Sequence, residues 1–156
     1  MDFLRTVITQ FSNHPCSPYI YCLEFCLKEY SKIEEFDQIF QEAINVLIQI
    51  CGRFLNSKDQ MTENAHIVDD FFQVQRQFLR QKYILFFQSD QLSTLTQLTL
   101  NGIGLHHEHA AQSHSSFIKE LLRHLTGEFK QSLALIQCQN PEAVANDNRL
   151  LIVSFF

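Results

Sequence analysis

The sequence predicts an all-α fold, and three features of its composition and pattern indicate this. Its 156 residues suit one domain of ordinary size, with enough chain to bury a core. Apolar residues make up 46% of the chain and include 15 Phe, whereas Gly and Pro number only 4 and 3. So few turn-forming residues argue against a many-stranded sandwich or barrel, which needs a tight turn about every ten residues. Apolar residues instead recur at helical spacing along most of the chain.

Two helices separated by a proline are expected at the N-terminal end. The first ends at His14-Pro15, because the residue before a proline is disfavoured in the α region. The second has Ser17 as its N-cap and Pro18 in the first helical position, and it ends at Glu29-Tyr30. The first helix carries its apolar residues at helical spacing: Phe3, Leu4, Val7, Ile8 and Phe11.

The middle of the chain predicts two strongly amphipathic helices joined by a polar loop. The first covers residues 36–55, although its interior Gly52 costs about 1 kcal/mol relative to alanine. Residues 56–62 are expected to form the loop, after which Thr62 or Asn64 caps the next helix. That helix buries Ile67, Val68, Phe71, Phe72, Phe78 and Leu79, and its polar side carries Gln73, Arg76, Gln77 and Arg80.

Three apolar segments follow in the C-terminal half. The run 83–87 is short and aromatic, and because the sequence offers no second strand to pair with it, we expect a buried helical turn. Ser89 or Asp90 then caps a helix with Leu92, Leu95, Leu98, Thr99 and Ile103 inward. A further helix carries Phe117, Ile118, Leu121, Leu122 and Leu125 on one side. Residues 139–148 read as a loop, and the final apolar run 150–156 is expected either to dock back onto the fold or to mark an interrupted reading frame. Its lack of a polar cap favours a fragment of a longer protein.

The spacing of the predicted helix pairs indicates repetition. Their first helices begin near Ser17, Glu63 and Ala110, at intervals of 46 and 47 residues. HEAT and armadillo units repeat about every 40 to 47 residues. The sequence therefore predicts a HEAT-like α-solenoid of antiparallel helix pairs, with about three repeats over residues 1–126 and a divergent segment, 127–156, that fits a truncated repeat. Periodicity alone allows an ordinary helical bundle equally well.

The net charge and the cysteines indicate which binding partners and which cellular environment suit the protein. Twelve Lys and Arg against 17 Asp and Glu give a net charge of −5 without long runs of one sign, which disfavours direct nucleic-acid binding. The chain has no apolar span of about 20 residues and no secretory leader, so we expect no membrane association. Its five Cys lack disulfide-framework spacing, as is typical of reduced intracellular proteins.

Two clusters of potential metal ligands occur, and both have a simpler explanation. His106-His107-Glu108-His109, with His114 nearby, lacks the His-Glu-x-x-His spacing that places two ligands one helical turn apart. A solvated loop between helices is expected there. The other cluster combines His14 with Cys16, Cys22 and Cys26, but Cys22 and Cys26 belong to an apolar helical stripe and are expected in the core.

Signatures of catalysis are likewise missing from the sequence. Asn101-Gly102-Ile103-Gly104 lacks the third glycine and the preceding strand of a dinucleotide-binding motif, so it is interpreted as a helix terminus. No Gly-x-Ser-x-Gly motif or comparable nucleophile signature occurs. The sequence therefore predicts a protein that is not an enzyme, with no catalytic residues, no metal site and no cofactor.

An ordered set of short motifs carries a resemblance to a known family. The set comprises His14-Pro15-Cys16 before a Tyr- and Leu-rich helix, the helix end Glu29-Tyr30, and Val68-Asp69-Asp70-Phe71-Phe72 followed by Phe78-Leu79-Arg80. In this order, over residues 2–125, the chain resembles the importin-β superfamily of nuclear transport receptors. It is most similar to the C-terminal half of the transportin branch that imports serine/arginine-rich splicing factors, a branch close to importin-thirteen.

The resemblance implies both an architecture and partners. Receptors of this type are HEAT-repeat superhelices that enclose protein cargo and shuttle between cytoplasm and nucleus. They bind the small GTPase Ran mainly through N-terminal repeats, which this chain would lack. The implied cargo is a serine/arginine-rich or other RNA-binding protein, and binding involves no covalent chemistry.

The resemblance also implies a cargo-binding face. In animal members of the branch, the helix after the Val-Asp-Asp pattern carries spaced arginines that hold phosphorylated Arg-Ser cargo. The corresponding residues here are Gln73 and Gln77, whereas Arg76 and Arg80 are displaced by one position, which turns a helical side chain by about 100°. The candidate cargo-binding residues are therefore Arg76, Arg80, Gln73 and Gln77.

Two other functions are compatible with the sequence. One is a helical-repeat scaffold or adaptor with no part in nuclear transport. The other is a small helical metalloprotein that uses the cluster around His106 and His109.

Overall fold

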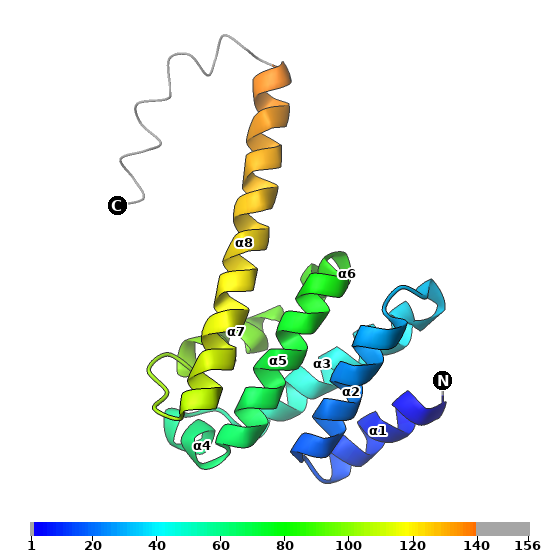
Figure 1. Cartoon of the computed structure of the whole chain (residues 1–156), viewed down its shortest axis with the longest axis vertical. Coiled ribbons are helices and arrows are strands. Elements are labelled where there is room, and N and C mark those ends of the chain that lie inside the picture. Colours follow the sequence, from blue (N-terminus) through cyan, green and yellow to red (C-terminus); the bar gives the residue numbers. More distant parts are fainter. Residues whose placement is uncertain (1, 140–156) are drawn as a thin grey trace. The chain divides into compact units, whose positions relative to one another are not determined.

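The structure is a computed structural model that describes the backbone of residues 2–139 and the side chains of residues 3–127 (Figure 1). Within this range the chain forms helices and no strands, which confirms the predicted all-α class. The chain divides into two compact units, Met1–Leu121 and Leu122–Phe156. Among the described residues, no helix combines the length and the apolar composition that crossing a bilayer requires.

The helices follow one another with short connections. In chain order they are α1 (Asp2–Asn13), α2 (Ser17–Tyr30), the 3-10 turn η1 (Glu34–Phe36), α3 (Asp37–Phe54), α4 (Lys58–Glu63), α5 (Ala65–Gln81), α6 (Tyr83–Phe87), α7 (Leu92–Asn101) and α8 (Glu108–Gln139). The predicted helices at residues 3–11, 17–30, 36–55 and 83–87 are thus present.

Helices of the first unit that are distant in sequence pack side by side. α2 packs on α5, and α3 packs on both α1 and α7. The C-terminal ends of α2 and α5 meet where Ser31 Oγ donates to Gln81 Oε1 at 3.3 Å. Asn45 Oδ1 on α3 accepts from Ser89 Oγ at 2.7 Å, and Asn101 Nδ2 donates to the carbonyl of Asn56 at 2.9 Å. α2 therefore runs parallel to α5, and α3 parallel to α7.

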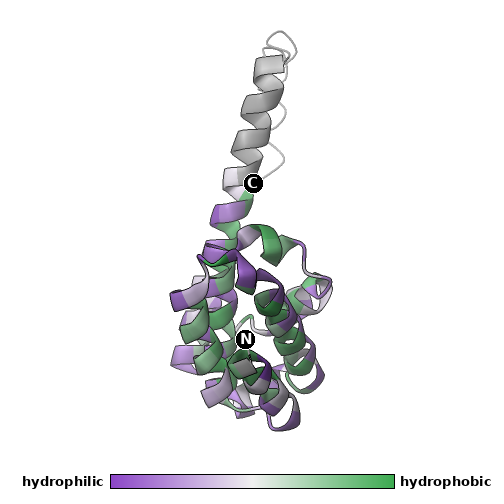
Figure 2. Cartoon of the chain, turned by 90° about the vertical axis from the view of Figure 1, so that its right-hand side faces the viewer, coloured by the Kyte–Doolittle hydropathy of each residue, from purple (hydrophilic) through white to green (hydrophobic). Residues whose placement is uncertain are grey.

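Aromatic and aliphatic side chains fill the space between these helices. Figure 2 shows hydrophobic residues gathered on the sides where helices face one another. The rings of Phe72 on α5 and Phe117 on α8 lie 5.6 Å apart, and Phe86 on α6 lies 6.2 Å from Phe117. Both Phe72 and Phe117 are fully buried. One continuous hydrophobic cluster therefore connects α1, α2, α3, α5, α6, α7 and the first turns of α8.

The segment predicted as a polar loop at residues 56–62 contains a helix, so that prediction was wrong. The backbone N–H of Gln60 donates to Ser57 Oγ at 3.3 Å, and Gln60 Oε1 accepts from the backbone N–H of Asn56 at 3.1 Å. These reciprocal bonds resemble a capping box, which stabilises a helix start. They explain why a polar sequence forms α4, with Met61 buried.

Several details at helix ends and surfaces also differ from prediction. Cys16, not Ser17, occupies the N-cap of α2, and Asn64 makes no side-chain capping bond to α5. Ile103, predicted inward, is 61% exposed because α7 ends at Asn101. Other side chains predicted to be buried are exposed: Tyr83, Ile84, Leu122 and Leu125. The predicted apolar run 150–156, and the predicted loop beyond Gln139, lie outside the described residues.

Candidate functional site

The four predicted cargo-binding residues lie on one face of α5. Gln73, Arg76, Gln77 and Arg80 are separated by three, four and seven positions, which places them along one side of a helix. The first three are half-buried and Arg80 is exposed. The opposite side of α5 carries the core residues, including Phe71 and Phe78. The structure thus brings these four residues together on the helix surface.

Of these four residues, Arg76 is the one whose charge is not paired within the described part of the chain. Arg80 Nε lies 3.8 Å from Glu120 Oε2 on α8, a long ion pair with the arginine side chain 48% exposed. Gln73 Nε2 donates to Asp69 Oδ1 at 2.9 Å, one turn earlier on α5. Among the described side chains, Arg76 makes no ion pair or hydrogen bond. This face can therefore accept an anion at Arg76 and, with little competition, at Arg80.

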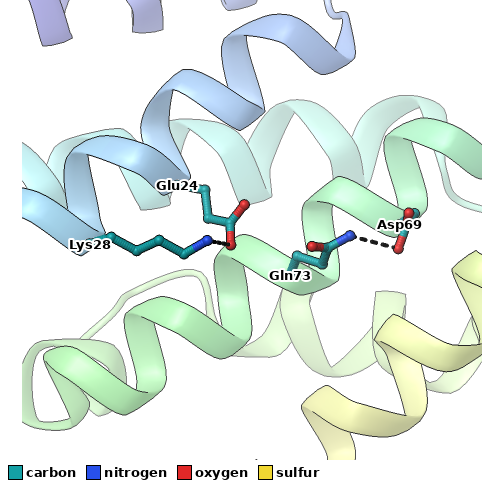
Figure 3. Close-up of polar contacts among 4 residues, drawn as sticks. All are labelled: Glu24, Lys28, Asp69 and Gln73. Carbon is teal, nitrogen blue, oxygen red and sulfur yellow. Dashed lines mark hydrogen bonds and ion pairs between the residues drawn. The ribbon is translucent and has the colours of Figure 1, made fainter.

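Acidic groups lie on α2 and in the first turns of α5, near the N-terminal side of Gln73. Figure 3 shows Glu24 and Lys28 on α2 next to Asp69 and Gln73 on α5. Lys28 Nζ pairs with Glu24 Oε1 at 2.7 Å. Partial burial raises the pKa of the Asp70 carboxyl, and the charges of Asp69 and Glu24 add to the rise. The surface is therefore mixed in charge, with carboxylates near α2 and arginines towards the C-terminal end of α5.

α2 also carries two exposed aromatic residues that the sequence prediction did not single out. Tyr21 is 63% exposed and Phe25 54% exposed, one helical turn apart. They lie outside the apolar stripe that the core-facing residues of α2 form. An aromatic residue off such a stripe is a sequence signal for an exposed contact residue, since aromatic side chains are enriched at interfaces.

The histidine-rich segment is not assembled as a cluster. His106, His107, Glu108 and His109 are all exposed, as the predicted solvated loop required, although the last two begin α8. His114 is instead buried, and its Nε2 lies 2.8 Å from the carbonyl oxygen of Thr99. Among the described residues, no three His, Cys, Asp or Glu side chains converge as metal ligands.

The cysteines that the structure describes are free thiols. Cys26 and Cys51 are buried, and burial raises the pKa of both thiols above the ordinary cysteine value. Cys16 and Cys22 are only partly buried. The predicted core position is thus confirmed for Cys26, whereas Cys22 lies at the edge of the core.

Comparison with known proteins adds no relative to this description. No protein-family model matches the chain, no curated protein matches it, and no solved structure matches it.

Proposed function

We propose that this chain forms HEAT-like repeats of a nuclear import receptor of the importin-β type and binds protein cargo on the surface of α2 and α5. The observation that carries the proposal is the number of sequence positions that separate two residues hydrogen-bonded between packed helices. Among the described residues, side-chain hydrogen bonds that join neighbouring parallel helices connect residues 44, 45 and 50 positions apart. Two of these offsets fall within the 40 to 47 residues by which HEAT and armadillo units repeat, and the third is slightly longer.

The helix boundaries support the same division into repeats. α2, α5 and α8 begin at Ser17, Ala65 and Glu108. Each of the first two is followed by an oppositely directed helix, α3 or the shorter α7, and these two helices pack on one another. α1 packs on both α2 and α3, as the second helix of a preceding pair would. This arrangement favours a HEAT-like solenoid over an accidental bundle.

The mixed charge of the surface suits a cargo segment that carries both signs. Phosphoserine would pair with Arg76 and Arg80, since arginine binds phosphate oxygens through charge-assisted hydrogen bonds. Arginines of the same segment would approach the carboxylates of Glu24 and Asp69. Tyr21 and Phe25 add apolar contact area beside these charges. The proposed cargo is thus a phosphorylated serine/arginine-rich protein, and the receptor would bind Ran through repeats other than these and would shuttle between cytoplasm and nucleus.

Charge reversal of the two arginines tests the cargo site. The double variant Arg76→Glu/Arg80→Glu should bind a fluorescein-labelled phosphorylated Arg-Ser peptide at least about tenfold more weakly, because a lost charge-assisted bond costs about 1.5–3 kcal/mol. Fluorescence anisotropy measures the affinity, and far-UV circular dichroism checks the helices. Arg5→Glu/Arg53→Glu is the matched control, since it changes the net charge equally at exposed positions on α1 and α3.

Two results would contradict the proposal. Equal losses in both double variants would mean that only net charge matters. If the folded chain binds neither the phosphorylated nor the unphosphorylated Arg-Ser peptide, the result would argue against an import receptor. It would favour a scaffold outside nuclear transport.

A further inference from the structure

Charges of opposite sign lie at opposite ends of one side of α5. Asp69 lies in the N-terminal half of the helix, and Arg76 and Arg80 lie in the C-terminal half, with Gln73 between them. The spacings from Asp69 to the two arginines are close to two and three full helical turns, so the three side chains share one side. At a rise of about 1.5 Å per residue, Arg76 lies about 10 Å and Arg80 about 16 Å from Asp69 along the axis. The sign of the charge therefore changes once along this side of α5.

The negative end has carboxylates that no cation of the protein neutralises. Within the described part of the chain, no lysine or arginine pairs with Asp69 or Asp70. Asp69 accepts a hydrogen bond from the neutral amide of Gln73. Lys28 on α2 pairs with Glu24 at 2.7 Å instead (Figure 3). This end therefore suits arginine or lysine side chains of a partner.

The positive end has an arginine that no carboxylate of the described residues neutralises. Arg76 is half-buried and makes no ion pair there. Arg80 and Glu120 form a long pair at 3.8 Å, with the arginine side chain 48% exposed, and such exposed pairs are weak. Two guanidinium groups about one turn apart can bind the oxygens of a phosphate through charge-assisted hydrogen bonds. This end therefore suits phosphoserine.

An extended segment can meet both ends only if its own charges are separated in the same way. Extended residues span about 3.3 Å each, so the distance from Asp69 to Arg80 corresponds to about five residues. Successive side chains of an extended chain point to opposite sides. A segment of strictly alternating arginine and phosphoserine thus presents α5 with arginines alone or with phosphoserines alone. A segment with arginines in one stretch and phosphoserines in the next presents both.

We propose that the cargo segment bound on α5 carries its basic and its phosphorylated residues in two consecutive stretches rather than in alternation. The arginine stretch lies along Asp69 and Asp70, and the phosphoserine stretch lies along Arg76 and Arg80. This inference rests on the proposed function, because it specifies the charge order of the cargo at the same site. It goes further, since a surface that recognised only the total charge would not distinguish the two kinds of segment.

Three fluorescein-labelled peptides of identical composition test the charge order. Each contains four arginines and four phosphoserines, and they differ only in sequence: one alternates, one has the arginines first, and one has the phosphoserines first. Fluorescence anisotropy measures their affinities. At least one of the two-stretch peptides should bind about tenfold more tightly than the alternating peptide, which is the effect of about one further charge-assisted hydrogen bond.

A pair of double variants shows whether this preference arises on α5. Asp69→Asn/Asp70→Asn removes both charges and keeps an acceptor for Gln73, so the preference for a two-stretch peptide should fall to within about twofold. Asp59→Asn/Glu63→Gln changes the net charge equally at exposed positions on α4 and should keep the full preference. Far-UV circular dichroism checks the helices of both.

The possible outcomes separate this inference from the proposed function. Equal binding of all three peptides, or tighter binding of the alternating one, would leave the cargo site in place and overturn the charge order. A preference that survives in Asp69→Asn/Asp70→Asn, or that the control loses to the same extent, would overturn it as well. If none of the three peptides binds, both the inference and the proposed function are wrong.

Discussion

His114 lies where three helices meet, and its side chain is buried. Burial disfavours the charged form of the imidazole because that form loses its hydration. His114 Nε2 donates to the Thr99 carbonyl at the end of α7, and its ring lies 4.7 Å from the ring of Phe72 on α5. Gly102 makes room for it, since a Cβ there would lie 2.7 Å from the imidazole. Burial lowers the pKa of His114, and the bond to Thr99 opposes this only partly.

The lowered pKa predicts a loss of stability in weak acid. Below the ordinary histidine pKa of about 6.5, the unfolded chain binds a proton at this residue that the folded chain resists, so the free energy of unfolding falls as pH decreases. His114→Gln, which keeps a donor for Thr99 but cannot titrate, should lose less stability between pH 7 and the folded-state pKa. Urea unfolding at several pH values measures this.

The exposed His106 supplies the comparison for this experiment. His106→Gln should retain the full pH dependence of the unmodified chain, because this exposed residue lies outside the buried surroundings of His114. If both variants show the same dependence, another group is responsible for it.

The α3–α7 contact shows how a helix pair depends on a small residue. Gly52 is an unfavourable residue in the interior of α3, yet a Cβ at this position would lie only 2.5 Å from Thr94 Cγ2 on α7. Alanine would gain about 1 kcal/mol in helix propensity and lose it to the clash. The glycine that the sequence marks as a helix defect is therefore the point of close approach between two helices.

A rescue experiment isolates this contact. Gly52→Ala should lower the free energy of unfolding by up to about 2 kcal/mol in urea titrations, which is an overpacking cost of about 1–3 kcal/mol less the gain of about 1 kcal/mol in helix propensity. Thr94→Ser removes the methyl group that clashes, so Gly52→Ala/Thr94→Ser should recover most of the loss. Gly127→Ala meets no atom within 4 Å and should be neutral or slightly stabilising. Absence of recovery in the double variant would mean that backbone packing, not Thr94, limits the approach.

Long-range cooperativity in the first unit follows from its single continuous core. Phe71 is 1% exposed and lies in the same cluster as buried residues of α2, α3, α7 and α8. Because these helices share one cluster, a void in α5 is expected to weaken the helices packed against it as well.

Phe71→Ala should therefore destabilise more than α5 alone. The free energy of unfolding should fall by about 3–5 kcal/mol, and amide protection from hydrogen exchange should fall in α2 and α3 as well as in α5. Thermal melts and exchange measured by mass spectrometry provide both readouts. Loss of protection confined to α5 would show that the helix pairs unfold independently.

Local pattern was sufficient to predict the long helices and most of the core, although it missed α4. Proline at position 15 separates α1 from α2, and the apolar spacing of Phe71, Phe72 and Phe78 defines the buried side of α5. The same spacing places Arg76 and Arg80 on the exposed side. These outcomes depend on contacts within a few residues, which helical periodicity encodes directly.

Other properties depend on which helices become neighbours, and periodicity carries no information on this. The burial of His114 requires α5 and α7 beside α8, and the need for Gly52 requires Thr94 opposite it. A polar groove between Gln41 of α3 and Leu85 of α6 exists only because these two helices lie across from each other. Polar side chains on a helix surface look alike in sequence whether they face water or a cavity, so only the packing of distant segments distinguishes the two.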